Sequence, residues 1–471
     1  MNYFNTIETA LRALRAQQKA MQVTGHNVAN ANTEGYSRQR AIQTATRPYA
    51  YPGMNMPAGA GQVGTGVEVS QIERVRDQFI DGQIREEAQS LGYWEQRYQG
   101  LHRMELIFNE PSDTSLSFVF NEFWKSLEDL SVYPEDTATR ATVRQRALNL
   151  VDGFHSLDDQ LVDYKRALNE DVKTTVEEIN SLARRIADLN EQIVNVETTG
   201  QKANDLMDQR DLLFERLSKL VNVRGSVDGE NNLSVTLGGS TLISYGEVHE
   251  LETVPSGNAE DAVIFKGTSV AVNATGGKLH GLLELRDKEI DDYIGKLDDL
   301  ASRLITAFNN SHNSGYGLDG STGIDFFRGS DAATIDITDE IKDPVDGLNR
   351  IAAAKDVDGD GTPDIPGDGS NALDLAEVVR ESKLFSSNTA SFMDYYQSMI
   401  STLGVEGQRA DQMVANQNVL VDQLKNQRNS ISGVSLDEEM ANIVKFQQAY
   451  NAAAKMISRS DQMLETLLSI I

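Results

Sequence analysis

One loop holds four acids at the spacing of calcium ligands. Together with Gly361, these acids occupy positions 1, 3, 5, 6 and 9 of a calcium-binding loop, in which oxygen donors surround the ion and glycine allows a sharp turn. The expected metal ligands are Asp356, Asp358, Asp360 and Asp364. Gly367 stands where the bidentate acid of position 12 is expected, and Pro363 and Pro366 disfavour flanking helices. Two interpretations stay open: a weak calcium site, or an acidic loop that only keeps an exposed tip soluble.

No other pattern in the chain predicts a reaction. Gly59, Gly61 and Gly64 have the spacing of a dinucleotide fingerprint, but a β-like stretch follows them where a helix should begin. The six histidines are scattered, and none forms the helical pair with a glutamate that hydrolytic zinc sites need. The absence of cysteine excludes disulfides, thiolate metal sites and cysteine nucleophiles. We therefore expect a protein that is not an enzyme and has no cofactor, with calcium as the open exception.

Both ends of the chain carry a heptad-like stripe of apolar residues. Near the N-terminus the stripe steps by three and four through Phe4, Ile7, Leu11, Leu14, Gln18 and Met21. It predicts an amphipathic helix that ends near Gly25, before a stretch rich in Asn and Gly. At the C-terminus, seven-residue steps join Ile443, Tyr450, Ile457, Leu464 and Ile471. Since a lone terminal helix buries little surface, we expect these stripes to find partners in other subunits.

The middle of the chain reads as a helical body. Interleaved Ile and Leu over 179–196, followed by a shorter helix over 206–220, predict an antiparallel helical hairpin. Apolar steps over 290–307 predict a partner helix, and residues 78–132 are expected to be helical. The packing of these segments is expected to be intramolecular core.

Only residues 221–278 look β-rich. Apolar residues alternate there between glycine turns, which predicts short hairpins, whereas 46–66 is rich in Pro and Gly and predicts a connector. The expected fold class is mainly α with a β insert, in which the N- and C-terminal helices pair as a coiled coil. The expected domains are a terminal coiled-coil domain (1–60 and 401–471), a long-helix bundle (61–221 and 279–400) and a small outer β domain (222–278).

The charge of the chain also narrows its partners. The 43 Lys and Arg residues face 71 Asp and Glu residues, which gives a net charge of −28 and argues against binding nucleic acid or an anionic membrane. Residues 1–60 carry +4 and residues 401–471 carry −2, so the middle carries −30. We expect the near-neutral ends to contact other protein surfaces and the acidic middle to face water. The chain shows no transmembrane run and no signal-peptide core, so any export is expected to use another route.

Two long motifs resemble a known family. The run from Thr24 to Gln39, TGHNVANANTEGYSRQ, resembles the N-terminal signature of bacterial flagellar rod, hook and hook-associated proteins. Its Tyr-Ser-Arg-Gln ending is most similar to the hook-associated protein 1 (FlgK) family. The run from Ser432 to Asn442, SGVSLDEEMAN, and the following FQQAY resemble the C-terminal signature of the same family. His26 and Glu34 stand where the family usually has Asn and Pro.

This resemblance implies a structural subunit at the junction between flagellar hook and filament, required for filament growth. It implies termini that are disordered until they fold in the inner layer of a tube, and an extracellular place reached by flagellar type III export without a cleaved signal peptide. Implied partners are the hook protein, hook-associated protein 3, an export chaperone at the C-terminal helix and further copies in a ring. The expected interface residues are Leu11, Leu14, Met21, Asn27, Asn30, Tyr36, Arg38, Ile443, Tyr450, Ile457 and Leu464.

Two other classes of function remain open from the sequence. An exported calcium-binding adhesin, or a metal-dependent enzyme on a flagellar scaffold, would use the acidic loop, and deleting 356–368 would then remove adhesion but not motility. A generic coiled-coil adaptor would be a stably folded monomer. Limited proteolysis separates the adaptor, whose ends would be protected, from an assembling subunit, whose ends would be trimmed quickly.

Overall fold

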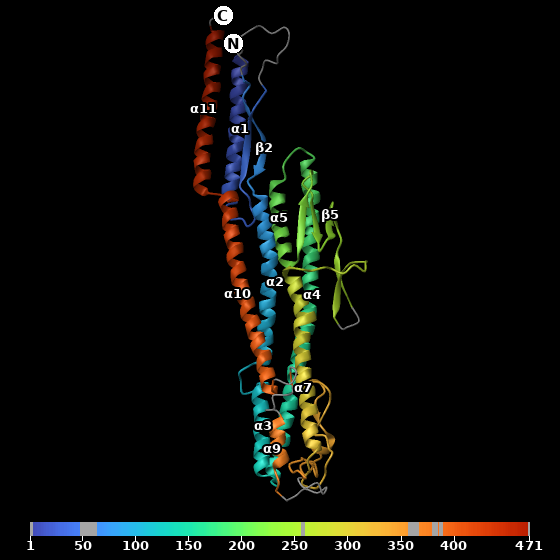
Figure 1. Cartoon of the computed structure of the whole chain (residues 1–471). Coiled ribbons are helices and arrows are strands. Elements are labelled where there is room, and N and C mark those ends of the chain that lie inside the picture. The colour runs from blue at the N-terminus through green and yellow to red at the C-terminus, as the bar shows by residue number, and fades with distance from the viewer. Residues whose placement is uncertain are drawn as a thin grey trace.

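Long helices run along almost the whole length of the molecule in the computed structural model (Figure 1). The structure describes residues 3–47, 64–255, 260–356, 367–378, 385 and 390–469. The helices are α1 (Tyr3–Ala29), α2 (Gln78–Phe108), α3 (Leu116–Val132), α4 (Thr137–Glu197), α5 (Asn204–Leu220), α6 (Gly277–Glu284), the π-helix η1 (Leu285–Glu289), α7 (Ile290–Asn313), α8 (Asp339–Lys342), α9 (Ser370–Val378), α10 (Phe392–Ser432) and α11 (Leu436–Leu468). Within these described parts, none of the helices is apolar over a length that would cross a bilayer.

The strands are short and few. They are β1 (Gln39–Ala45), β2 (Val67–Arg74), β3 (Val223–Val227), β4 (Leu233–Leu237), β5 (Ser240–Ser244), β6 (Glu247–Val248), β7 (Leu251–Pro255), β8 (Asp261–Phe265), β9 (Phe327–Arg328) and β10 (Asp336–Ile337). Strands β3 to β6 form one antiparallel sheet in sequence order, and three two-stranded ribbons complete the set. The expected fold class, mainly α with a β insert, is confirmed.

Helices α4 and α5 form the predicted antiparallel hairpin. Helix α4 is 61 residues long, and its first turn is capped by Asp136, whose carboxylate accepts the backbone N–H groups of Ala138 and Thr139. Its Ile179 and Ile186 are fully buried, as the stripe predicted. The chain then turns at Gly200, whose positive φ of 82° favours glycine, and α5 packs back along α4.

Two predicted helix boundaries are wrong. Helix α1 continues four residues beyond Gly25, because the hydrogen bonds of Asn27 described below outweigh the cost of about 1 kcal/mol for an internal glycine. The segment 78–132 is two helices. Helix α2 ends at Asn109, which takes a left-handed φ of 49°, and α3 begins after Ser115, whose hydroxyl caps Phe118.

The β insert packs directly on the helices. A tight turn at Gly238 and Gly239, both with positive φ, joins β4 to β5 as the glycine pattern predicted. Val235 and Leu242 on these strands are fully buried in the same hydrophobic core as the helices. Residues 270–272, where apolar side chains also alternate, form no full strand but pair with β8 through an isolated bridge between Ala271 and Ile264.

Of the β ribbon near the N-terminus, only the β-like stretch after Gly64 was predicted. Strands β1 and β2 pair antiparallel from Gln39 with Arg74 to Ala45 with Val67, so β structure is not confined to 221–278. Their sequences, QRAIQTA and VEVSQIER, are mostly polar and carry little alternation, which hid them. Both strands contact α1, which supplies the packing that their own side chains lack.

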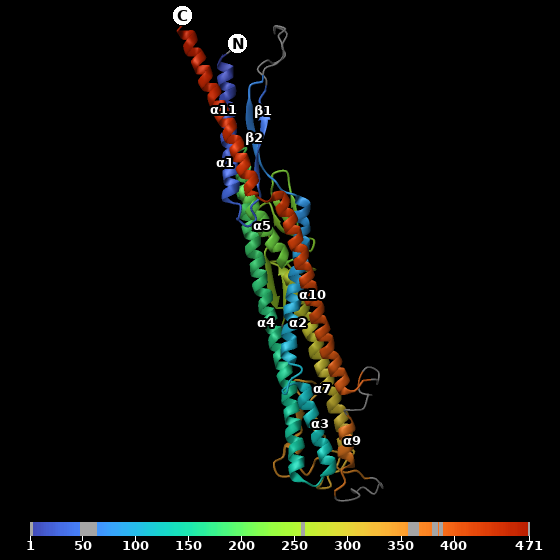
Figure 2. The same ribbon diagram turned by 90° about the vertical axis from the view of Figure 1, so that its left-hand side faces the viewer.

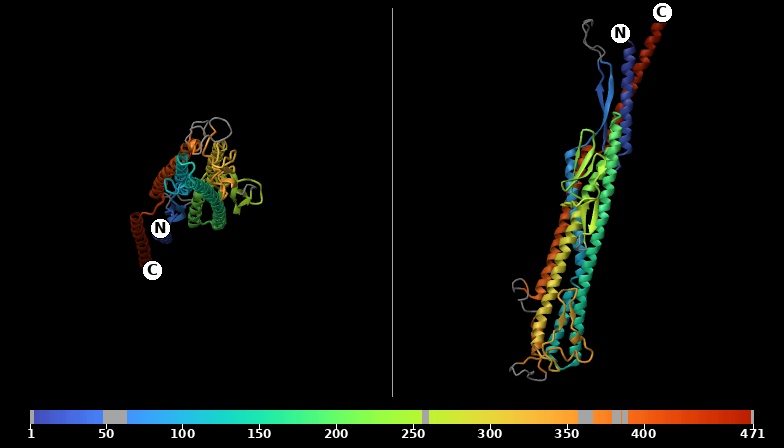
Figure 3. Two further views of the ribbon diagram at one scale, coloured as in Figure 1. Left: turned by 90° about the horizontal axis from the view of Figure 1, so that it is seen from below. Right: turned by 90° about the vertical axis from the view of Figure 1, so that its right-hand side faces the viewer.

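The terminal helices α1 and α11 lie side by side at one end of the molecule, next to the β1–β2 ribbon, and both termini are there (Figures 1 and 2). This confirms the predicted pairing of the two ends. Seen along its length, α11 lies to one side of the body (Figure 3). The buried residues of α1 and α11, such as Ala16 and Ala453, do not belong to the continuous core of the described body, which runs from Leu101 to Ala410.

Candidate functional site: the joint between the terminal helices and the body

Both signature motifs meet where the terminal helices join the body. We call this region the joint; it comprises residues 26–39, 74–81, 425–439 and helix α5. After α1 ends, the backbone N–H of Asn30 donates to the carbonyl of His26 and that of Thr33 to the carbonyl of Asn30, which turns the chain back. Gly35 completes the turn with a φ of 80°, and a Cβ there would approach Leu212 of α5 to 3.2 Å. The loop therefore requires glycine at this place.

Asn27 holds the turn together. Its Nδ2 donates to the carbonyl of Gln39 at 2.9 Å and to Oε2 of Glu439 at 3.2 Å. Its Oδ1 accepts the hydroxyl of Tyr36 at 2.8 Å and the backbone N–H of Gln39 at 2.9 Å. Asn27 is only 1% exposed, so this one side chain uses its hydrogen-bonding capacity inside the protein.

Arg38 joins the two ends of the sequence. Its backbone N–H donates to the carbonyl of Ser432 at 2.9 Å, and its guanidinium binds Glu438 at 2.8 Å and Glu439 at 2.9 Å. The Glu439 side chain is 2% exposed, which makes this pairing stronger than an ordinary surface ion pair. The N-terminal loop and the start of α11 are therefore fixed to each other.

Helix α5 fixes the same loop to the body. Asp208 accepts the backbone N–H of Ser37 at 2.9 Å and its hydroxyl at 2.8 Å, and it also binds Arg74 at 2.8 Å. Burial raises the pKa of Asp208, although Arg74 and Ser37 counteract it. Burial would also raise the pKa of Asp211, but the charges of Arg76 and Arg74 outweigh burial and lower it. Exposed pairs add His26 with Asp205 at 3.5 Å and Glu34 with Arg216 at 2.8 Å.

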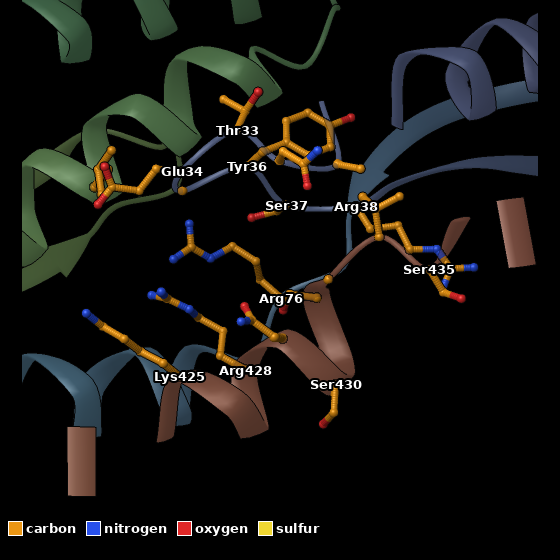
Figure 4. Close-up of a pocket in the computed structure, with 18 of the residues that line it drawn as sticks. Thr33, Glu34, Tyr36, Ser37, Arg38, Arg76, Lys425, Arg428, Ser430 and Ser435 are labelled. Carbon is orange, nitrogen blue, oxygen red and sulfur yellow. The ribbon is translucent and has the colours of Figure 1, made fainter. Parts of the chain in front are cut away.

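A cavity of about 630 Å³ lies at the centre of the joint. Figure 4 shows Arg76, Arg428 and Lys425 directed into it, opposite Glu34 and Ser37. These cations are already paired: Arg428 binds Glu215 at 2.7 Å, Lys425 approaches Glu215 at 3.6 Å, and Arg76 binds Asp81 and Asp211 at 2.8 Å. The cavity is therefore lined by internal ion pairs, which tie α10 and the segment between β2 and α2 to α5.

The structure brings part of the expected interface set into the joint. Asn27, Tyr36 and Arg38 lie at its centre, and Asn30 lies at its edge, where its side chain donates to the carbonyl of His26. Burial raises the pKa of the Tyr36 phenol, as do the neighbouring acids. No partner subunit is present, so contact of these residues with neighbouring subunits stays a prediction.

The other expected residues lie along the terminal helix pair. On α1, Leu11 is 37% exposed and Leu14 and Met21 are half-buried, whereas the buried residues are mostly small or polar: Ala10, Ala16, Ala20, Val23, Thr24 and Asn27. On α11 the predicted stripe is half-buried throughout, at Ile443, Tyr450, Ile457 and Leu464. Packing within one chain therefore leaves part of both predicted stripes accessible.

Sequence reasoning missed the charged side of the joint. Asp205, Asp208 and Asp211 recur every three residues and so share a face of α5, while Arg74 and Arg76 share a side of an extended segment. These two spacings were a signal for a matched pair of charged surfaces. They were not recognised because neither the full length of β2 nor its pairing with β1 was predicted.

The expected calcium ligands Asp358, Asp360 and Asp364 lie outside the described residues, and Asp356 lies at the edge of them. Over the part of the chain that the structure describes, no group of three or more His, Asp or Glu side chains could hold a metal ion. The calcium site stays a prediction.

Comparison with known proteins decides the family. Flagellar hook-associated protein 1 of Bacillus subtilis is 33% identical over 504 aligned residues, which cover 99% of this chain and 98% of that protein. The chain belongs to the flagellar hook-associated protein 1 family. Relatives of the same name from Salmonella typhimurium and Escherichia coli are 29% and 28% identical, each over 98% of this chain. As a member of this family, the chain is a structural component of the flagellum and associates with other flagellar components.

Family matches divide this hook-associated protein in a way that fits its structure. Residues 101–327 match the flagellar hook-associated protein FlgK helical domain. Residues 7–36 match the flagella basal body rod protein family, and residues 425–470 match the C-terminal family of the flagellar basal body rod proteins FlgEFG. The latter two segments meet at the joint, so the part shared with rod proteins is the terminal pair.

A solved structure has the same fold. The flagellar hook junction protein FlgK from Burkholderia pseudomallei aligns with a TM-score of 0.63 and 17% identity, and the alignment covers 74% of this chain and all of that one. At 17% identity, this match supports a common fold and nothing further.

Proposed function

We propose that this chain forms the junction between the flagellar hook and the filament and is required for filament growth. The observation that carries the proposal is the joint, where two segments that resemble rod proteins, about 400 residues apart in sequence, are tied to each other and to a family-specific helical body. Such a subunit would contribute a terminal helix pair of the kind that rod proteins also have, together with a helical body that is specific to its own family. The hook protein on one side and hook-associated protein 3 on the other are the proposed neighbours.

The terminal helices supply the proposed assembly surface. Ordering the backbone costs about 1 to 2 kcal/mol per residue, and α1 buries mainly alanines within its own chain. Burial against further copies in a ring would provide the missing stabilisation. Exposed apolar residues on α11, among them Met440, Val444 and Met463, could be covered by an export chaperone before assembly.

The proposed route to the cell exterior is flagellar type III export. A chain without cysteine passes a narrow channel unfolded without any disulfide to break, and it reaches an oxidising exterior chemically unchanged. The many acidic residues outside the ends would then face water on the assembled structure.

Electron microscopy of a strain lacking this gene tests the proposal. We expect hooks without filaments and flagellin accumulating in the medium, both reversed by the wild-type gene on a plasmid. Immunoblots of hook protein in the same cells serve as the control that earlier assembly is intact. Full-length filaments on the deletion strain would contradict the proposed function.

A further inference from the structure

A polar groove separates helix α2 from the edge of the β insert. We call it the arginine groove. Its volume is about 710 Å³, and it is lined by Arg85, Glu86 and Gln89 of α2, by residues 222–225, and by the glycine turn between β4 and β5. Strand β3 is the edge strand of its sheet and borders the groove, with the carbonyl of Val223 accepting the side chain of Gln89 at 3.0 Å.

Arg85 lies on the α2 wall and forms no ion pair within the described parts of the chain. Its guanidinium carbon lies 4.9 Å from the centre of the Phe214 ring, and over the described residues the side chain makes no ion pair and no hydrogen bond. The acids nearest to it, Asp81, Asp211 and Glu215, are paired with Arg76 and Arg428 instead. Burial lowers the pKa of Arg85, which shows that these acids do not compensate its desolvation.

A second arginine occupies the opposite wall. Arg224 on β3 is exposed and, like Arg85, forms no ion pair with any residue that the structure describes. Glu86 also lines the groove but bonds neither arginine within the described parts of the chain. Gly225 lets the strand approach, because a Cβ at this place would lie 2.6 Å from the Phe214 ring under Arg85. Both arginines therefore line one groove, and neither forms an ion pair with a residue that the structure describes.

We propose that the arginine groove receives carboxylate side chains of a second copy of this chain in the assembled flagellum. The inference rests on the proposed function, because it needs copies packed side by side. A guanidinium binds a carboxylate through two parallel hydrogen bonds, which suits a groove with an arginine on each wall. The chain itself is the matching partner: its net charge is −28, and residues 311–400 alone hold seventeen acidic against six basic side chains.

Site-specific photo-crosslinking in flagellated cells tests this contact. Asn273 lines the groove and is exposed, so Asn273→p-benzoylphenylalanine places a reactive group there; Glu177→p-benzoylphenylalanine on the exposed face of α4 is the matched control. After irradiation, we expect a covalent dimer of this chain in purified flagella from the first variant and none from the second. Adding Arg85→Gln and Arg224→Gln to the first variant should reduce the dimer at least fivefold.

Each outcome bears on the inference. Absence of the dimer in flagella that contain the variant and carry filaments overturns it, and so does a cross-link to a different flagellar protein alone. Absence of the chain from flagella would instead contradict the proposed function. Because Arg85→Gln removes packing on Phe214, Arg224→Gln is also made alone, with Arg224→Lys as its charge-preserving control: the dimer should fall only in the former.

Discussion

The joint depends most on one side chain, Asn27, and a neighbour of the same type offers a matched control. Asn27→Ala removes the hydrogen bonds to the backbone N–H and carbonyl of Gln39 and leaves the buried carboxylate of Glu439 with Arg38 as its partner, a cost of about 2 to 3 kcal/mol. Asn30→Ala removes two exposed hydrogen bonds, one to the carbonyl of His26 and one from the hydroxyl of Thr33, and should cost only about 0.5 kcal/mol. In the deletion strain, we expect filaments with the second variant but several-fold fewer with the first.

Counting filaments by electron microscopy and measuring swim-plate diameter check this prediction. Immunoblots of cells and medium must show equal amounts of the two variants, so that a loss of filaments reflects assembly. Equal filament numbers for the two variants would show that the joint tolerates an open hydrogen-bond network, which would contradict the role given to Asn27.

The residues on the N-terminal side of the joint could be predicted from the sequence, whereas those on helix α5 could not. Asn27, Tyr36 and Arg38 could be chosen from the sequence because they lie in a long signature motif. Asp208 could not, since an acid on an amphipathic helix usually faces water, and only the β1–β2 ribbon brings Ser37 and Arg74 onto it. That ribbon is stabilised by packing against α1. The strand propensity of its own residues cannot predict such a tertiary contact.

Among the elements, α2 and α5 approach closely at a glycine. A Cβ on Gly92 would lie 2.1 Å from the carbonyl oxygen of Lys219, whereas a Cβ on Gly82 of the same helix would meet only the tip of Arg85 at 3.9 Å. Gly92→Ala must therefore push α5 away and should destabilise the protein by about 2 kcal/mol or more. Gly82→Ala should leave stability unchanged or raise it by up to about 1 kcal/mol through helix propensity.

Urea unfolding followed by circular dichroism at 222 nm measures both variants against the wild type. The midpoint should fall for Gly92→Ala alone, with the slope unchanged in both. If Gly92→Ala unfolds at the wild-type midpoint, α2 and α5 are not held at the distance that the structure gives.

Helices were easier to predict from the sequence than the elements against which they pack. Stripes over 179–196 and 290–307 predicted buried helix faces, because a long helix in a body repeats its core residues every three or four positions. On α1 the apolar stripe with Leu11 and Leu14 was the predicted contact face. Within the chain, however, Ala10, Ala16 and Ala20 are more buried than these leucines. A single helix with two apolar faces does not reveal which face its own chain covers and which is left for others.

For the whole molecule, the separation of the terminal pair from the core predicts how the free subunit is cleaved. Helix α1 has 27 residues, and ordering its backbone costs about 1 to 2 kcal/mol of free energy per residue. Burial of one CH₂ group stabilises the folded state by only about 0.8 kcal/mol. The few alanines and half-buried residues between α1 and α11 are too little for stability without neighbours. The body, by contrast, has one continuous core from α2 to α10.

We therefore expect brief trypsin treatment of the purified full chain to remove both ends. Cleavage should occur at Arg38, Arg40 or Arg47 and after Arg428 or Lys445, while helix α4, which also carries basic residues, stays intact because its buried face belongs to the continuous core of the body and keeps the helix folded. Intact mass spectrometry over a time course identifies the fragments. Trypsin acting on assembled flagella is the control, in which neighbours should protect the same sites. Ends that resist trypsin in the free chain as long as α4 does would show a self-sufficient terminal pair, as in a coiled-coil adaptor, and would contradict folding on assembly.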